Sequence, residues 1–196
     1  MRFRMNKVVA FATAVACAAI FHPISHAQAA GAAPTDPQIV GIVVGANQID
    51  IDYGKLAVSK SKNKEVRDFA QQMVTDHSAL QKSVFDLGAK LKVTPAESDT
   101  AKSLKSQSEE TTEKLKALKG KAFDKAYIDN EVAYHKMVIN AVSSVLIPNA
   151  KNAELKSALE GAAPLFQGHL EHAQKVQTDL EGKKRASQKR GHKAGS

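Results

Sequence analysis

Cysteine, tryptophan and long apolar runs are scarce in this chain of 196 residues. The one cysteine, Cys17, lies in an apolar stretch near the start, and tryptophan is absent. The rest of the chain therefore has no thiol, which excludes disulfides, cysteine nucleophiles and thiolate metal ligands there. Beyond that first stretch, no segment approaches the roughly 20 apolar residues of a membrane-spanning helix. We expect no transmembrane span after signal cleavage.

Common catalytic motifs are also missing. The sequence contains no glycine-rich phosphate loop, no GxSxG elbow and no HExxH zinc motif. Gly41 and Gly45 lie inside a helical apolar pattern, where we expect them to permit close helix packing. These absences favour a non-enzymatic protein.

The net charge of +8 is concentrated at the two ends of the chain. Residues 30–181 hold 19 basic and 20 acidic residues, so the body of the protein is close to neutral. The charge therefore predicts no specific nucleic-acid binding. The basic segment after Gly182 is expected to be a solvated tail, and contact with an anionic envelope surface, such as lipopolysaccharide, is the less favoured alternative.

The first 29 residues have the order of a secretion signal. A basic start precedes an apolar run too short to span a membrane, and Ala27-Gln28-Ala29 supplies a small-x-small cleavage site. Cleavage after Ala29 predicts a periplasmic or secreted protein, with outer-membrane association as a variant. Lipoprotein processing at Cys17 is the less favoured alternative, because the usual leucine three residues earlier is missing.

A short linker over 30–35 leads into a helical domain over 36–181. Apolar residues recur there at spacings of three and four, and strand-like alternation is not seen. Asp36 is expected to cap the first helix, with Pro37 at its first position, and Asn63 to cap the second. Two further apolar stripes follow, one from Phe123 to the Pro148-Asn149 break and one over about 152–180.

The segment between the second and third of these stripes is different. Thr94-Pro95-Ala96-Glu97 has the pattern of a capping box and predicts a helix start. The helix that follows is polar, so we expect it to cross over the other helices. The predicted fold class is all-α: a ferritin-like four-helix bundle of two antiparallel hairpins, joined by a long crossover containing a polar helix. A disordered basic tail is predicted over 182–196.

Three of the predicted helices each turn one histidine toward the interior. His77, His135 and His169 each lie at helical spacing between two apolar residues of their stripe. At 1.5 Å per residue they lie roughly 17–26 Å along their helices, so the three can meet in one layer. Two carboxylates lie near them in register: Asp50 on the interior face of the first helix, and Glu131 one turn before His135.

Interior imidazoles need partners, because an unpaired buried polar group costs about 1–3 kcal/mol. One alternative is that each histidine bonds an acid, a tyrosine or a backbone carbonyl and fixes helix register. The other is that the imidazoles and carboxylates bind iron, manganese, zinc or copper. The Glu-x-x-His spacing of di-iron bundles is missing, since Glu131 precedes His135 by four residues, so no ferroxidase centre is expected.

The chain is similar to the exported bacterial ferritin-like proteins classed as domain of unknown function 4142, often labelled outer-membrane proteins. Four segments carry the resemblance: IDIDYGKLA (49–57), VRDFAQQMVTDHSAL (66–80), AFDKAYIDNEVAYH (122–135) and LFQGHLEHAQ (165–174). The resemblance implies a two-hairpin bundle and an envelope location, and it puts the recurrent histidines of the family on His77, His135 and His169. Members commonly carry Glu where this chain has Asp50 and Asp52. The resemblance implies no activity.

Two interpretations of function result. The first is a non-enzymatic envelope protein with a role in stress tolerance or surface maintenance and with structural histidines. The second is a metal-binding protein or weak metal-dependent oxidoreductase that uses His77, His135 and His169 with Asp50 or Glu131. The sequence favours the first.

Overall fold

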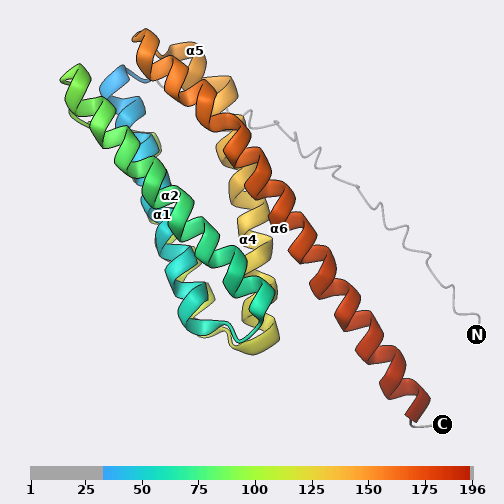
Figure 1. The fold of residues 1–196 in the computed structure, drawn as a ribbon. Helices are drawn as coiled ribbons and strands as arrows, with labels where there is room; N and C mark the ends of the chain where they lie inside the picture. The colour runs from blue at the N-terminus through green and yellow to red at the C-terminus, as the bar shows by residue number, and fades with distance from the viewer. Residues whose placement is uncertain (1–32, 195–196) are drawn as a thin grey trace, which may run out of the picture. The chain divides into compact units, whose positions relative to one another are not determined.

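The computed structural model describes the backbone of residues 33–194 and the side chains of residues 33–182. The predicted signal peptide over 1–29, Cys17, and residues 30–32 of the predicted linker over 30–35 lie outside this range. Within it, all regular structure is helical (Figure 1), which confirms the all-α class. The elements are α1 (Asp36–Lys60), α2 (Lys64–Leu91), α3 (Asp99–Ala117), α4 (Gly120–Ala141), η1 (Val142–Leu146), α5 (Ile147–Asn149) and α6 (Ala153–Ala194).

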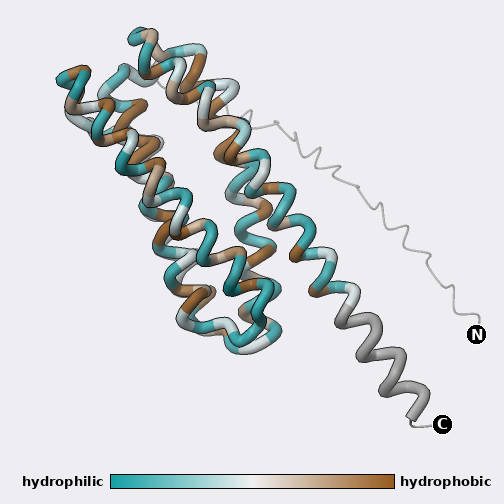
Figure 2. Tube along the Cα trace, viewed as in Figure 1, coloured by the Kyte–Doolittle hydropathy of each residue, from teal (hydrophilic) through white to brown (hydrophobic). Residues whose placement is uncertain are grey.

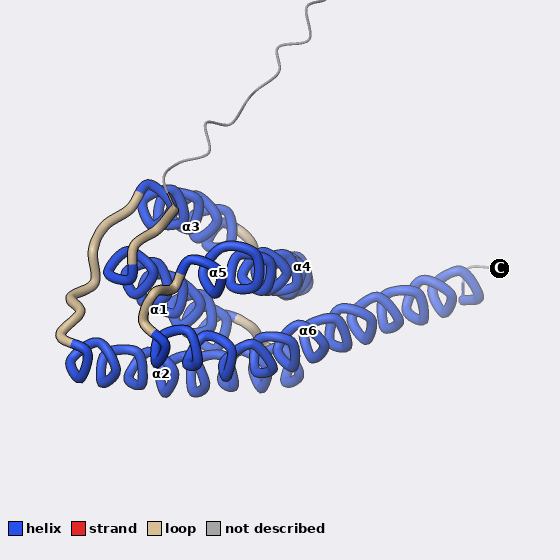
Figure 3. The backbone as a smooth tube through the Cα atoms, turned by 90° about the horizontal axis from the view of Figure 1, so that it is seen from above, coloured by secondary structure: helices blue, strands red, loops and turns tan. Residues whose placement is uncertain are grey.

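The long helices form two pairs. α1 packs most extensively along α2, and α4 along α6. Seen from above (Figure 3), α1 lies between α2 and α3, so the polar helix α3 covers the side of α1 that faces away from α2. None of the described helices combines the length and apolar character needed to cross a membrane.

The helix starts agree only partly with the caps expected from the sequence. Asn63 caps α2 as predicted, because its side chain accepts a hydrogen bond from the Glu65 amide at 3.0 Å. The cap of α1 is Thr35 rather than Asp36. The Asp36 carboxylate instead accepts hydrogen bonds from the amides of Lys151 and Asn152, at 2.8 and 2.9 Å, and so joins the start of α1 to the turn before α6.

The helix start predicted at Thr94 is wrong, because α3 begins at Asp99 with Ser98 as its cap. The segment before it runs along the start of α1, where the Ala96 amide donates to the Pro37 carbonyl at 2.9 Å. This contact explains Gly41, since a Cβ there would lie 2.1 Å from the Ala96 carbonyl oxygen. Gly41 therefore permits the close approach of a loop rather than of a helix.

The third stripe ends near Pro148-Asn149 as predicted, after one π-helical turn, η1. Pro148 has no N–H for a helical hydrogen bond, and the widened turn lies immediately before it. The last helix differs from the sequence expectation of disorder over 182–196. The backbone of α6 is helical as far as Ala194, consistent with the high helix propensity of Lys, Arg, Ala and Gln.

The apolar core consists of two clusters along the helix axes. Figure 2 shows hydrophobic positions recurring between hydrophilic ones on each long helix. One cluster contains Phe69, Met73 and Tyr127, and the other contains Ile39, Leu146 and Phe166. On α1, α2, α4 and α6, one buried polar residue each comes in sequence between members of the two clusters: Asn47, His77, His135 and His169. Asp50 and Glu131 lie within about one helical turn of Asn47 and His135. The bundle therefore has a polar layer between two apolar layers.

Candidate metal centre

The polar layer is built from the five residues that the sequence proposed: His77, His135, His169, Asp50 and Glu131, here called the polar centre. They come from α2, α4, α6, α1 and α4 respectively, and their exposed fractions are 0–3%. The ring centroids of His77 and His135 are 5.7 Å apart, those of His77 and His169 5.1 Å, and those of His135 and His169 5.4 Å. The convergence expected from helix register is therefore present.

Each imidazole has one ring nitrogen held by an oxygen outside the centre. His77 Nδ1 lies 2.8 Å from Asn47 Oδ1, and the Asn47 amide is oriented by its own bond to the Val43 carbonyl. His135 Nδ1 lies 3.0 Å from the Glu131 carbonyl oxygen. His169 Nε2 lies 3.0 Å from Asp76 Oδ2. Because these oxygens accept, the nitrogen that contacts each of them carries the proton.

The second ring nitrogen of each histidine therefore has a lone pair, and those of His77 and His135 face Asp50. These atoms are His77 Nε2, His135 Nε2 and His169 Nδ1, and none has a hydrogen-bond partner among the described residues. A metal-binding histidine normally donates its other N–H to a carboxylate or carbonyl in this way, which fixes ring orientation and tautomer. All three histidines meet that requirement.

Asp50 lies closest to two of these lone pairs. Its Oδ2 is 3.1 Å from His77 Nε2 and 3.4 Å from His135 Nε2. Glu131 Oε2 is 3.6 Å from His135 Nδ1. When both acids are ionised, their carboxylate oxygens lack a hydrogen-bond donor among the described side chains and backbone groups.

The short contacts between Asp50 and the imidazoles are not ion pairs at neutral pH. Burial, with help from the neighbouring imidazoles, lowers the pKa of His77 to about 3, and burial lowers the pKa of His135 to about 4. Burial likewise raises the pKa of Asp50 to about 7, although its hydrogen bond with Glu131 acts against the rise. The pKa of Glu131 is raised well above its usual range by burial and by Asp50. The imidazoles are neutral, as metal ligands must be.

The polar centre is thus a dense group of unpartnered atoms. Seven buried side-chain atoms converge there: one nitrogen from each histidine and both oxygens of Asp50 and Glu131. A proton shared between the two carboxyl groups would satisfy one oxygen of each and leave the other five. At about 1–3 kcal/mol for each unsatisfied group, the total is comparable with the whole stability of a domain, about 5–15 kcal/mol.

The potential ligand atoms form two groups that share His135, each small enough to surround an ion. One ligand atom each from His77, His135 and His169 lie within 4.8 Å of one another, and so do those of Asp50, Glu131 and His135. Ligand bonds of about 2.0–2.2 Å place tetrahedral ligand atoms roughly 3.3–3.6 Å apart, close to the two contacts of Asp50. The polar centre could therefore hold a metal with only small movements of its side chains.

Two further residues complete this arrangement: Asn47, which the sequence did not single out, and Asp76, whose partner it did not predict. Asn47 lies three residues before Asp50 on the interior face of α1, and a polar residue at that stripe position was the available signal. Asp76 is adjacent to His77, but its partner is His169, 93 residues away in the sequence. No local pattern predicts that pairing. His172, one turn after His169, lies outside the centre and contacts Gln72.

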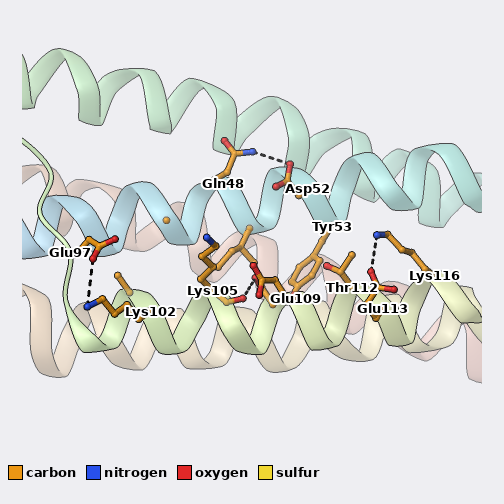
Figure 4. Close-up of a pocket in the computed structure, with 14 residues that line it drawn as sticks. Gln48, Asp52, Tyr53, Glu97, Lys102, Lys105, Glu109, Thr112, Glu113 and Lys116 are labelled. Atoms are coloured by element: carbon orange, nitrogen blue, oxygen red, sulfur yellow. Dashed lines mark hydrogen bonds and ion pairs between the residues drawn. The ribbon is translucent and has the colours of Figure 1, made fainter.

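A groove of about 540 Å³ lies elsewhere, between α1 and α3 (Figure 4). Its walls carry charges of both signs, including Asp52, Glu109 and Lys105, and the Tyr53 ring lies against it. None of the five residues of the polar centre lines this groove. It offers no set of unpartnered polar atoms comparable with that of the polar centre.

The sequence profile of the family described as Domain of unknown function (DUF4142) matches residues 22–176. No curated protein and no solved structure matches the chain. The matched segment includes the five residues of the polar centre and their outer partners Asn47 and Asp76. The description of the family names no activity, so function is argued from the geometry of the centre.

Proposed function

We propose that this chain, which belongs to the DUF4142 family, is a metal-binding protein that holds one first-row transition-metal ion in its polar centre. The observation that carries the proposal is the convergence of seven buried, unpartnered nitrogen and oxygen atoms between two apolar layers. Three imidazole nitrogens and the Asp50 carboxylate would bind the ion directly. Glu131 lies beside them as a further ligand or as the acceptor for a water on the ion.

The chemistry of the ligands defines the class of ion. Imidazole together with carboxylate suits iron, manganese, zinc or copper, and the absence of thiols from the centre disfavours ions that require sulfur. Two ionised carboxylates and three neutral imidazoles carry a formal charge of −2, which a divalent ion neutralises. Such an ion would also remove the cost of leaving these groups unpaired in the interior.

The proposed role is ion binding rather than conversion of an organic substrate. All five side chains of the centre are almost fully buried, so a substrate larger than water or a diatomic molecule has no contact with them. A non-enzymatic contribution to stress tolerance, by holding a redox-active or toxic ion, is consistent with this burial. The structural interpretation favoured by the sequence is weaker here, because histidines that only fix helix register would not need four unpartnered carboxylate oxygens beside them.

The order of elements and the N-terminal sequence support two further parts of the proposal. Pairing of α1 with α2 and of α4 with α6, joined through α3, is consistent with a ferritin-like bundle of two hairpins. The basic start, the apolar run and Ala27-Gln28-Ala29 support export to the cell envelope. Mass spectrometry of the exported form should find Ala30 as its first residue, and an acylated Cys17 would contradict this.

Elemental analysis tests the proposed function. The full chain, expressed without a histidine tag and isolated from the envelope fraction, should contain close to one equivalent of iron, manganese, zinc or copper. A His135→Ala variant prepared in the same way should contain almost none, because His135 belongs to both groups of potential ligands. His172→Ala is the matched control and should keep the ion. Equal metal content in all three proteins, or no metal in any, would contradict the proposal.

A further inference from the structure

We propose that a divalent cation reaches the polar centre through the seam between α2 and α6, along a polar ladder formed by Gln72, Asp76, His172 and His169. This inference rests on the proposed function, since it describes the access of the ion to the same centre. The ladder consists of two hydrogen-bonded pairs of side chains. Asp76 pairs with His169 at 3.0 Å, and one turn farther along, Gln72 pairs with His172 at 2.9 Å.

The outer partners of the three histidines differ in exposure. Asn47, which holds His77, is 3% exposed. The backbone carbonyl that holds His135 belongs to Glu131, which is fully buried. The Asp76 side chain is 29% exposed, whereas the His169 side chain that it holds is 1% exposed. Asp76 therefore connects a buried ligand of the centre directly to solvent.

The second pair, Gln72 and His172, extends the polar path to the surface. Gln72 is exposed and His172 is half-buried. The His172 ring packs edge-to-face with the buried Phe69 ring, with centroids 5.2 Å apart. This apolar contact holds His172 at the solvent-exposed side of the α2–α6 seam. A carboxylate, an imidazole and an amide oxygen are all groups that bind divalent cations.

Three other seams between helices lead to the centre, and two of them, α1–α2 and α4–α6, are closed by more extensive packing. The α1–α2 pair has the most extensive helix contact in the structure, and that between α2 and α6 is much smaller. Between α1 and α4, the Tyr134 hydroxyl donates to the Ala46 carbonyl at 2.9 Å, and Tyr134 is 8% exposed. Among the described residues, the α2–α6 seam is thus the approach where polar side chains lead from solvent to an unpartnered nitrogen, His169 Nδ1.

Two neighbouring glutamines on α2 allow a matched test. Gln72 lies at the seam, whereas the adjacent Gln71 is exposed and contacts Thr75 on its own helix. Gln72→Lys and Gln71→Lys add the same charge to the protein and differ only in where they place it. A positive charge at the mouth of a cation route slows association at low ionic strength, and salt screens the effect.

The experiment measures the rate at which the metal-stripped full chain takes up Co²⁺, followed by visible absorbance after rapid mixing. We expect Gln72→Lys to slow uptake about tenfold at low salt, Gln71→Lys to change it less than twofold, and both to bind as much Co²⁺ at equilibrium as the wild type. Gln72→Glu should accelerate uptake. Equal rates for the two lysine variants would overturn the route and leave the centre intact. A wild type that binds no Co²⁺ or other transition metal would overturn the proposed function and the route together.

Discussion

Asp50 Oδ2 and His77 Nε2 face each other 3.1 Å apart across the α1–α2 pair, yet neither atom has a hydrogen-bond partner among the described residues. A neutral imidazole and a buried carboxylate oxygen in this position both present lone pairs, so they repel unless a cation or a proton lies between them. The pKa of His77 is lowered to about 3, so the imidazole is not the source of that proton at neutral pH. In the metal-free protein a proton on the Asp50 carboxyl group, whose pKa is raised to about 7, satisfies both atoms, and a bound cation would do so once that group is ionised.

The first prediction concerns Asp76, which orients His169 from outside the centre. Asp76→Ala removes the acceptor for His169 Nε2 and with it the preference for a lone pair on Nδ1. Loss of such an outer partner typically lowers metal affinity about 10–100-fold. Competition with a chelator of known affinity should show this loss, while saturating metal should still give one equivalent bound.

The control for Asp76 is Asp68→Ala on the same helix. Asp68 is exposed and pairs with Lys64, so its removal should leave metal affinity within about twofold of the wild type. Equal losses in the two variants would mean that the general charge of α2, rather than the contact with His169, determines the affinity.

The second prediction concerns the metal-free protein at alkaline pH. The pKa of Asp50 is raised from 3.8 to about 7, and that of Glu131 is raised further above its usual range. The folded state therefore holds protons that the unfolded chain has released, and the stabilisation from them is lost as the pH rises through the folded pKa values. The contribution of Asp50 is lost between about pH 4 and pH 7, and that of Glu131 declines further as the pH rises toward its own folded pKa. The thermal midpoint should therefore fall as the pH rises above about 6.5.

The histidines oppose this change only below about pH 6.5, the ordinary pKa of an imidazole. The pKa of His77 falls from 6.5 to about 3, so its contribution is present above pH 6.5 and is lost only on acidification. Differential scanning calorimetry of the Asp50→Asn/Glu131→Gln double variant should show little decline over the alkaline range. A wild-type midpoint that stays level or rises from pH 7 to pH 9 would refute the assigned direction of the shifts.

The third prediction compares two glycines on α1. A Cβ at Gly41 would lie 2.1 Å from the Ala96 carbonyl oxygen, whereas a Cβ at Gly45 would meet nothing within 4 Å. Gly41→Ala should therefore lower the free energy of unfolding by about 1–3 kcal/mol. Gly45→Ala should raise it by up to about 1 kcal/mol through helix propensity. Chemical denaturation measures both, and similar effects of the two substitutions would contradict the close approach of the 94–97 segment.

Much of the fold could be predicted because it depends on local patterns. The apolar stripes predicted the long helices, and Asn63 correctly predicted the start of α2. The starts near Asp36 and Thr94 were wrong because nearby residues offer equally good caps, Thr35 and Ser98, and tertiary contacts decide between them. The bond between Ala96 and Pro37 that draws the 94–97 segment onto α1 joins residues 59 positions apart.

The polar centre was predictable for a related reason. A histidine or an acid on an apolar helix face is visible in the sequence, and His77, His135, His169, Asp50 and Glu131 were all found in this way. The pairing of Asp76 with His169 depends on the relative register of α2 and α6, which no local spacing determines. The choice between structural and metal-binding histidines likewise required the orientation of each ring.

Calorimetric titration of the metal-stripped full chain with Zn²⁺ and Mn²⁺ tests metal binding most directly. The account predicts one ion per chain for the wild type and for His172→Ala, with a thermal midpoint that rises with metal concentration. His77→Ala, His135→Ala and His169→Ala should each lose this binding and the associated stabilisation. Wild-type protein that binds neither these ions nor iron or copper, with a midpoint unaffected by metal, would contradict the metal centre.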